Sequence, residues 1–252
     1  MVNKNWKFDI VIPTYNEREN VEPLFSKIYS LYKDRLNKVI FVDDNSPDGT
    51  GDILEKLKIT YPNYIEVIHR YEERGRGSAG IAGFKQALKH DVYCIVEMDA
   101  DFSHDPYYIA IFLEMINFYD VVIASRYVEG GGQINRSFSR ELISKLANMI
   151  YRLLLGTKIT DLSGGFKCYR KSILEKLNFD EFISKGYSIG METLFHCYRL
   201  GATFLEIPVV FHDRRRGKSK FNIKECINSF IVALKLSLKY GQINWINLHY
   251  PK

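Results

Sequence analysis

The chain has 252 residues, a length that one α/β domain can fill without splitting into two. Hydrophobic residues make up 46% and charged residues 26%, the proportions of an ordinary globular protein. No run approaches the roughly 18 to 20 consecutive apolar residues that a membrane-spanning helix needs, and residues 1–9 lack the apolar core of a signal peptide. These features predict a cytoplasmic protein whose contact with a membrane, if it has one, is peripheral.

The formal net charge of +5 is modest, but basic side chains gather in residues 213–220. A cluster of this kind suits phosphate groups, so charge alone leaves nucleic acid, anionic lipid and a nucleotide diphosphate open as partners. The four cysteines form no CxxC pair and fall in apolar patterns, which predicts reduced core residues rather than disulfides or a zinc site. They are Cys94, Cys168, Cys197 and Cys226.

Strands and helices alternate from the beginning of the chain. Residues 8–13 and 38–43 are short apolar runs typical of buried parallel strands, and residues 21–36 between them place apolar side chains at helical spacing. Further helices are expected at 52–61, 79–89 and 191–200, and further strands at 64–69, 92–98 and 120–124. This order predicts an α/β fold with an open, mostly parallel sheet flanked by helices.

Polar residues follow the predicted strands directly. In open parallel sheets, ligands bind at the carboxyl ends of the strands. Residues 14–17 follow the first strand, 43–46 the second and 99–101 the fourth, while Ser125 and Arg126 follow a later one. We therefore expect the site at this edge of the sheet.

Asp99 and Asp101 place two carboxylates two residues apart at the mouth of a buried strand. Hard oxygen ligands in this arrangement suit Mg²⁺ or Mn²⁺ bridging a diphosphate. The alternative is an acidic turn that caps the helix expected near Pro106. A second acidic pair at a strand end, Asp43 and Asp44, favours the metal interpretation.

Seven stretches in chain order resemble the dolichyl-phosphate mannose synthase group of inverting glycosyltransferase family 2, which has the GT-A fold. They are residues 12–20, 42–50, 98–104, 125–127, 161–166, 186–192 and 213–220. Because they span almost the whole chain in order, they are far more specific than any one of them alone.

The resemblance implies a donor site, a metal site and an acceptor site. The residues implied for the nucleotide-sugar donor are Pro13, Tyr15, Glu17, Val42, Asp44, Asp99, Ala100, Asp101, Arg214 and Lys220. Asp101 would bind Mg²⁺ or Mn²⁺, with Asp99 and Ser103 as further candidate ligands. Arg126, Arg140 and Ser144 would receive the acceptor phosphate, and Glu192 would position the sugar. The residues expected to act in catalysis are Asp101, Arg126, Arg214 and Lys220.

The implied reaction is transfer of mannose from GDP-mannose to a dolichyl or polyprenyl phosphate, with inversion to a β-linked product. A phosphate acceptor is largely ionised at neutral pH, so no general base is required. The alternative donor is UDP-glucose. A non-catalytic basic module that binds phosphate or membrane is a third interpretation, and the absence of GxGxxG after the first strand disfavours a dinucleotide-dependent oxidoreductase. Carboxylates at several strand ends argue against nucleic acid as a partner.

Two segments have amphipathic patterns, residues 142–155 and 223–240. They can cover the core of a soluble enzyme or lie among lipid headgroups, and a lipid acceptor favours the membrane. We expect a GT-A catalytic domain at 1–222 and a C-terminal amphipathic, interfacial segment at 223–252 packed on it, with Trp245, Tyr240 and Tyr250 as further interfacial anchors. The protein would be peripheral on the cytoplasmic face, either self-sufficient or bound to a small membrane subunit.

A glycine-rich stretch and one histidine complete the candidate site. Residues 75–80 contain three glycines and are expected to form a flexible turn near the nucleotide. Among the six histidines, His104 lies within a site stretch and is the one to test.

Overall fold

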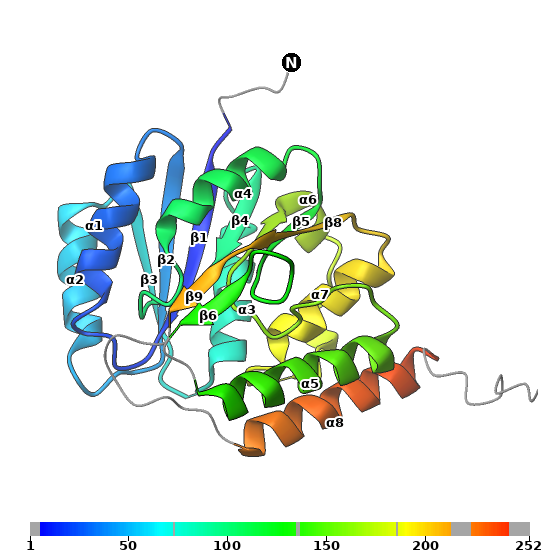
Figure 1. Ribbon diagram of the computed structural model, residues 1–252. Helices are drawn as coiled ribbons and strands as arrows, with labels where there is room; N and C mark the ends of the chain where they lie inside the picture. Colours follow the sequence, from blue (N-terminus) through cyan, green and yellow to red (C-terminus); the bar gives the residue numbers. More distant parts are fainter. Residues whose placement is uncertain (1–5, 73, 135–136, 185, 213–222, 242–252) are drawn as a thin grey trace, which may run out of the picture.

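The computed structural model describes residues 6–72, 74–134, 137–184, 186–212 and 223–241. The strands of its main sheet are β1 (Phe8–Thr14), β2 (Leu36–Asp43), β3 (Ile65–His69), β4 (Cys94–Glu97), β5 (Val121–Ser125), β7 (Lys167–Arg170) and β8 (Phe204–Pro208). Within the described residues they pair in the order β3-β2-β1-β4-β7-β5-β8 (Figure 1). Strand β7 runs antiparallel to β4 and β5, and the other pairs are parallel. The predicted mostly parallel sheet is confirmed.

Helices cover both faces of this sheet. They are α1 (Val21–Tyr32), α2 (Thr50–Thr60), α3 (Arg76–Ala87), α4 (Ile109–Met115), α5 (Phe138–Leu155), α6 (Lys171–Leu174), α7 (Ile189–Arg199) and α8 (Ile223–Lys239), with short 3₁₀ turns at Pro106–Tyr108 and Phe179–Glu181. Successive strand residues face opposite sides of a sheet. Ile10 and Ile12 accordingly pack in one core with α1, α2 and α4, whereas Val11 packs in the other with α3, α5, α7 and α8.

A second, two-stranded sheet lies in front of the main one. It consists of β6 (Gly132–Ile134) and β9 (Val210–His212), which are parallel (Figure 1). Strand β9 continues the chain directly from β8, and the amide of Val209 between them donates to the carbonyl of Ser125. The ribbon therefore extends the β5 end of the main sheet.

Sharp turns follow three of the parallel strands at one edge of the sheet. Asn16, Asn45 and Phe102 have φ angles of 59°, 54° and 61°, in the left-handed region that few non-glycine residues adopt. The amide of Asp44 donates to the carbonyl of Thr14, so the turns after β1 and β2 are tied together. These turns bring the polar residues of three strand ends to one place.

The structure corrects two of the predicted elements. Helix α1 ends at Tyr32, and Leu36, expected as its last residue, instead begins β2. Residues 76–80, expected as a flexible turn, form the first part of α3, with Gly75 as the residue that precedes it. A β-carbon on Gly77 would lie 2.2 Å from the Gly186 carbonyl oxygen. The glycine there therefore allows α3 to approach the chain closely.

The described helices include none that is both long and apolar enough to cross a membrane. Cys94, Cys168 and Cys197 are buried and unpaired, as predicted. Cys226, expected in the core, is partly exposed on α8 because that helix packs with one side only.

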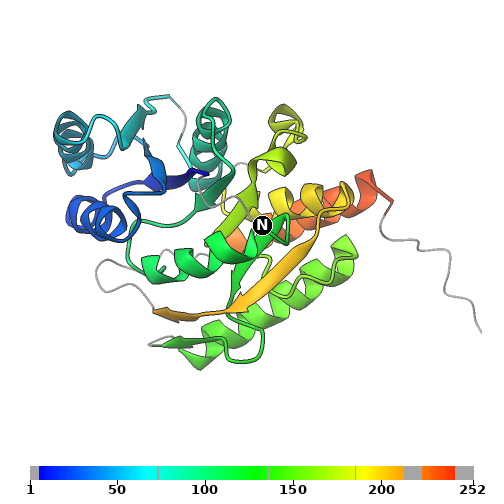
Figure 2. The ribbon, with the colours of Figure 1, turned by 90° about the horizontal axis from the view of Figure 1, so that it is seen from above.

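Helices α5 and α8 lie side by side in both ribbon views (Figures 1 and 2). Ala233 and Leu236 of α8 are buried in the core shared with α7. The outer sides of helices α5 and α8 carry exposed apolar residues, which are Leu142, Ile143, Leu146, Met149, Ile150 and Leu153 of α5 and Ile227, Phe230, Ile231 and Leu238 of α8. We call these ten residues the apolar face. The proposed boundary at residue 222 lies outside the described residues, as do Trp245 and Tyr250, and remains a prediction.

Candidate active site

A pocket of about 330 Å³ opens at the carboxyl ends of β1, β2 and β4, and we call it the strand-end pocket. Its lining includes the predicted donor residues Pro13, Tyr15, Glu17, Asp44, Asp99, Ala100 and Asp101. Val42, also predicted, is fully buried in the core beside Asp43 and is not part of this lining. The structure thus brings seven of the predicted donor residues together.

Asp44 is held between the glycine-rich turn and an arginine. Its Oδ2 accepts a hydrogen bond of 2.7 Å from the Gly75 amide, and its Oδ1 lies 3.1 Å from Arg70 Nη1. Burial raises the pKa of Asp44, although these partners oppose the shift. A carboxylate fixed in this way at the pocket wall can accept hydrogen bonds from a ligand's N–H or O–H groups.

Asp101 is 5% exposed, and its neighbour Ser103 orients it. Asp101 Oδ1 accepts hydrogen bonds from the amide of Ser103 at 3.0 Å and from its hydroxyl at 2.6 Å. The alternative capping interpretation holds for Asp105, whose side chain accepts from the Tyr107 amide at the start of a 3₁₀ turn. The metal interpretation of Asp99 and Asp101 remains a prediction.

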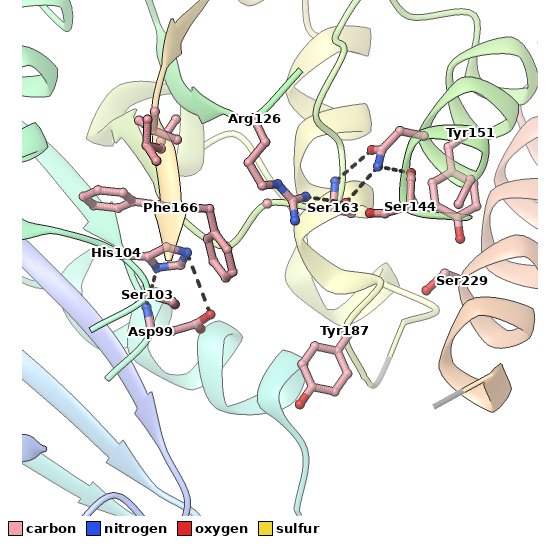
Figure 3. A pocket seen from close by; sticks show the side chains of 18 of the residues that line it. Asp99, Ser103, His104, Arg126, Ser144, Tyr151, Ser163, Phe166, Tyr187 and Ser229 are labelled. Carbon is pink, nitrogen blue, oxygen red and sulfur yellow. Dashed lines mark hydrogen bonds and ion pairs between the residues drawn. The ribbon is translucent and has the colours of Figure 1, made fainter. Parts of the chain in front are cut away.

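His104 supports the turn that carries Asp99. Its Nδ1 accepts a hydrogen bond of 3.0 Å from the Asp99 amide, and its ring stacks on Phe166 with centroids 5.0 Å apart (Figure 3). Burial lowers the pKa of His104, while Asp99 and Asp101 oppose the change. In this structure His104 shapes the wall of the site.

A second pocket, of about 260 Å³, lies beside α5 and α8, and we call it the helix pocket. Figure 3 shows Asp99, Ser103 and His104 on one side of it, Ser144, Tyr151 and Ser229 on the other, and Arg126 between. Both pockets are lined by Asp99 and Tyr187. They therefore adjoin at these two side chains.

Arg126, predicted at the acceptor site, is 9% exposed and bound to the fully buried Asp161. Its Nε and Nη2 lie 2.7 Å from the two carboxylate oxygens, and Nη2 also donates to Ser163 Oγ at 2.8 Å. Burial raises the pKa of Asp161, but the Arg126 guanidinium overcomes this and holds the pKa below its ordinary value. The pair presents a fixed cation to the helix pocket.

Ser144 lines the same pocket, where its Oγ accepts a hydrogen bond of 2.7 Å from the Tyr127 hydroxyl. The other predicted residues lie elsewhere. Arg140, one turn earlier on α5, is half-buried and lines neither pocket. Arg214 and Lys220 lie outside the described residues.

Glu192, predicted to position the sugar, is fully buried and lines neither pocket. Its two carboxylate oxygens accept hydrogen bonds of 2.8 Å from the amides of Ile183 and Ser184. Burial raises its pKa, but the nearby His196, with Nε2 3.6 Å from Oε1, and the hydrogen bonds from those amides overcome this and lower the pKa. Glu192 thus anchors the segment before Tyr187, and any effect on a sugar would pass through that segment.

Several polar residues of the site were not identified from the sequence. Among them are Arg76, Asn148, Asp161 and Tyr187. Asp161 and Tyr187 lie in stretches that carried the family resemblance, and that was the available signal. Asn148 gave a weaker one, an amide on α5 four residues after Ser144, and its Nδ2 donates to the Ser144 carbonyl and to Ser163 Oγ.

Residues 9–178 match the family described as "Glycosyl transferase family 2", and the chain belongs to that family. It is 36% identical over 222 residues to the polyprenol monophosphomannose synthase of Mycolicibacterium smegmatis, covering 86% of this chain and 83% of that protein. It is also 37% identical to the undecaprenyl-phosphate mannosyltransferase of Micrococcus luteus, over 84% of this chain and 86% of the relative. The dolichol-phosphate mannosyltransferase of Pyrococcus furiosus is 40% identical over 95% of this chain and 66% of its own length.

Among solved structures, the fold is similar to glucosyl-3-phosphoglycerate synthase from Mycobacterium tuberculosis in complex with Mn²⁺, uridine diphosphate and phosphoglyceric acid. The TM-score is 0.68 at 16% sequence identity, over 92% of this chain and 78% of that one. This likeness shows a GT-A-type fold. The family match and the three mannosyltransferase relatives show that the chain is a glycosyltransferase.

Proposed function

We propose that this protein transfers mannose from GDP-mannose to a polyprenyl phosphate of the dolichyl type, inverting the sugar linkage to β. The observation that carries the proposal is the pair of adjoining pockets. One is lined by carboxylates and the turns after β1, β2 and β4, and the other contains a buried arginine. The mannosyl donor and the polyprenyl acceptor follow the names of the three relatives.

The strand-end pocket would hold the nucleotide, with Asp44 accepting hydrogen bonds from the base or ribose. A divalent cation, Mg²⁺ or Mn²⁺, would bind in the strand-end pocket. Magnesium is commonly held by one or two carboxylates together with substrate phosphates, and Asp99 and Asp101 supply such oxygens. No cluster of three His, Cys, Asp or Glu side chains suited to a metal occurs among the described residues. The donor's phosphates would therefore complete the coordination.

The ion would stabilise negative charge on the departing diphosphate. Asp101, whose Oδ1 accepts hydrogen bonds from Ser103, would contribute a carboxylate to that ion. Arg214 and Lys220 are proposed to bind the same diphosphate, because arginine and lysine stabilise charge where it develops.

The helix pocket would receive the acceptor phosphate at Arg126. Asp161 occupies the Nε and Nη2 side of the guanidinium, and Nη1 makes no hydrogen bond with the described residues. This nitrogen would donate to a phosphate oxygen, with Ser144 and Arg140 as further candidates. The phosphate needs no general base, since its second pKa is near ~6. Attack from the pocket opposite the leaving group inverts the sugar carbon.

The apolar face would lie against the membrane that holds the lipid. Helices α5 and α8 line the helix pocket with one side, through Ser144, Tyr151 and Ser229, and expose apolar side chains elsewhere. A polyprenyl chain attached to a phosphate in that pocket could reach lipid along these helices. The protein would then act peripherally on the cytoplasmic face.

The test is transfer of radiolabelled sugar to a short polyprenyl phosphate in detergent, with Mn²⁺ or Mg²⁺ and with GDP-mannose or UDP-glucose as donor. Lipid labelled from GDP-mannose alone is expected, and EDTA should abolish it. Label from UDP-glucose alone would replace the proposed donor. Absence of transfer from either donor, with intact nucleotide binding, would refute the proposed acceptor.

A further inference from the structure

A chain of buried charges lies beneath the point where the two pockets adjoin. Glu97, the last residue of β4, is 1% exposed and faces Lys167 across the antiparallel pair with β7. Lys167 is fully buried, and its Nζ lies 3.8 Å from Glu97 Oε2. Arg76, the first residue of α3, reaches the same carboxylate, with Nη1 3.0 Å from Oε1. One carboxylate thus lies between the fully buried Lys167 and Arg76, which is 14% exposed.

Arg76 binds Asp99 as well. Its Nε and Nη2 lie 2.9 Å and 2.8 Å from Asp99 Oδ1. All three guanidinium nitrogens therefore face the carboxylates of Glu97 and Asp99. Glu97 ends β4, and Asp99 follows it two residues later. A planar guanidinium bridges two carboxylates in a fixed geometry, whereas lysine offers a compact charge with rotatable donors on a flexible stem.

Glycines make room for this arrangement. A β-carbon on Gly165 would lie 2.5 Å from Arg76 Nη2 and 3.1 Å from Asp99 Oδ2. A β-carbon on Gly190 would lie 2.7 Å from Lys167 Nζ. Gly165 lines the helix pocket, and Gly190 lies in the first turn of α7. A side chain at either position would collide with one of these cations.

Fixing Asp99 in this manner has a chemical effect. Two neighbouring carboxylates at one strand end repel each other, and burial strengthens the repulsion. The two cations offset it. Arg76 holds Oδ1, and Oδ2 of the same carboxylate lies 4.0 Å from His104 Nε2.

We propose that Arg76 is a positioning residue for sugar transfer, which holds the Asp99 carboxylate in one orientation while Glu97 and Lys167 hold Arg76. The inference rests on the proposed function, in which the Asp99 carboxylate would help to hold the metal ion at the donor. It gives Arg76 a role that acts through Asp99 and needs no direct contact with substrate.

The test compares Arg76→Ala and Arg76→Lys with Lys85→Ala, a control on the same helix whose exposed side chain pairs with Asp180 at the surface. Hydrogen bonds to charged groups are strong enough that losing them should lower kcat roughly tenfold to hundredfold in Arg76→Ala. The KM for GDP-mannose should change less than kcat. Arg76→Lys should recover only part of the loss, and added guanidinium ion should partly restore Arg76→Ala. Lys85→Ala should match the wild type.

A normal kcat in folded Arg76→Ala would overturn the inference, and so would a defect confined to donor KM, which would indicate direct phosphate binding. If Arg76→Ala does not fold, the same comparison is made with Arg76→Gln.

A second measurement does not depend on transfer. Thermal unfolding midpoints of Arg76→Ala, Asp99→Ala and the double variant form a cycle that isolates the contact. The double variant should lose less than the sum of the single losses, and additive losses would contradict the inference. Absence of transfer by the wild type would count against the proposed function alone, and the cycle would still decide this point.

Discussion

Arg126 illustrates how the chemistry of one residue depends on a partner far away in the sequence. Its position after β5 predicted a phosphate-binding cation, but its orientation is set by Asp161, which is fully buried and binds two of its nitrogens. Removing one member of a buried ion pair leaves the other charge uncompensated. The pair is therefore expected to matter for stability as well as for acceptor binding.

We predict that Asp161→Asn lowers the free energy of unfolding by about 3 to 5 kcal/mol at pH 7, the usual cost of breaking a buried ion pair. The folded-state pKa of Asp161 lies below its ordinary value of 3.8, so its contribution is present above that pH and is lost as the pH falls through the folded-state pKa. Urea unfolding should show a constant difference between variant and wild type from pH 7 to about 5 and a narrowing one below about 4. A difference that grows on acidification would contradict the assignment.

Asp101→Asn keeps the shape of the side chain and removes the charge that a metal ion needs. We expect transfer to fall by roughly 10²-fold or more, the scale of lost electrostatic stabilisation at a reacting group, with little change in the thermal midpoint of the free protein. Ser103→Ala removes only the hydroxyl that donates to Asp101 at 2.6 Å. It should have a smaller effect and should raise the Mn²⁺ concentration needed for half-maximal activity. Equal activity in Asp101→Asn at all Mn²⁺ concentrations would exclude Asp101 as a ligand.

Single residues at strand ends were predictable, because the hydrophobic pattern locates the strands and the polar residues follow directly. Glu17, Asp44 and Asp101 were found in this way and lie together in the structure. Arg76 could not be found, because its partners Glu97 and Asp99 are brought to it only when α3 packs beside β4.

At the scale of elements, the alternating strands and helices of the first half were predicted to within a few residues. Strand β7 was missed because it begins with Lys167, a fully buried cation that breaks the apolar pattern expected of a central strand. The start of α3 was missed because glycine is unfavourable inside helices. Two of its glycines are required by packing, since a β-carbon on Gly77 would lie 2.2 Å from the Gly186 carbonyl oxygen and one on Gly83 would lie 2.2 Å from Val11 Cγ1.

Two alanine substitutions on α3 should therefore have opposite effects. Gly77→Ala would place its β-carbon 2.2 Å from the Gly186 carbonyl oxygen and should destabilise the protein by roughly 1 to 3 kcal/mol. Gly80→Ala would meet its nearest atom, Glu97 Oε1, at 3.7 Å, an ordinary contact. It should stabilise by up to about 1 kcal/mol through helix propensity. Urea unfolding measures both, and the same sign for the two variants would refute the packing argument.

At the scale of the whole molecule, the adjoining pockets and the apolar face occupy connected parts of the surface. Tyr151 and Ser229 line the helix pocket from α5 and α8, and Leu153 of α5 is 73% exposed on the apolar face. An exposed apolar patch of this size usually marks an interaction surface. A lipid phosphate could therefore place its phosphate in the helix pocket and its apolar chain along the apolar face of the same two helices.

We predict that Leu146→Glu combined with Leu153→Glu abolishes binding to vesicles. Fully burying a leucine side chain contributes about 1.5 to 3 kcal/mol, so losing two should weaken partitioning by roughly 10²-fold or more. The thermal midpoint should stay near that of the wild type, because both side chains are already exposed in the folded protein, at 46% and 73%. Flotation with vesicles of neutral and anionic phospholipid provides the measurement. The matched control is Ile59→Glu on α2, whose side chain is 79% exposed on the other side of the sheet and should leave binding unchanged. Vesicle binding by the double variant at wild-type strength would show that the apolar face serves a protein partner or a second copy of the chain instead.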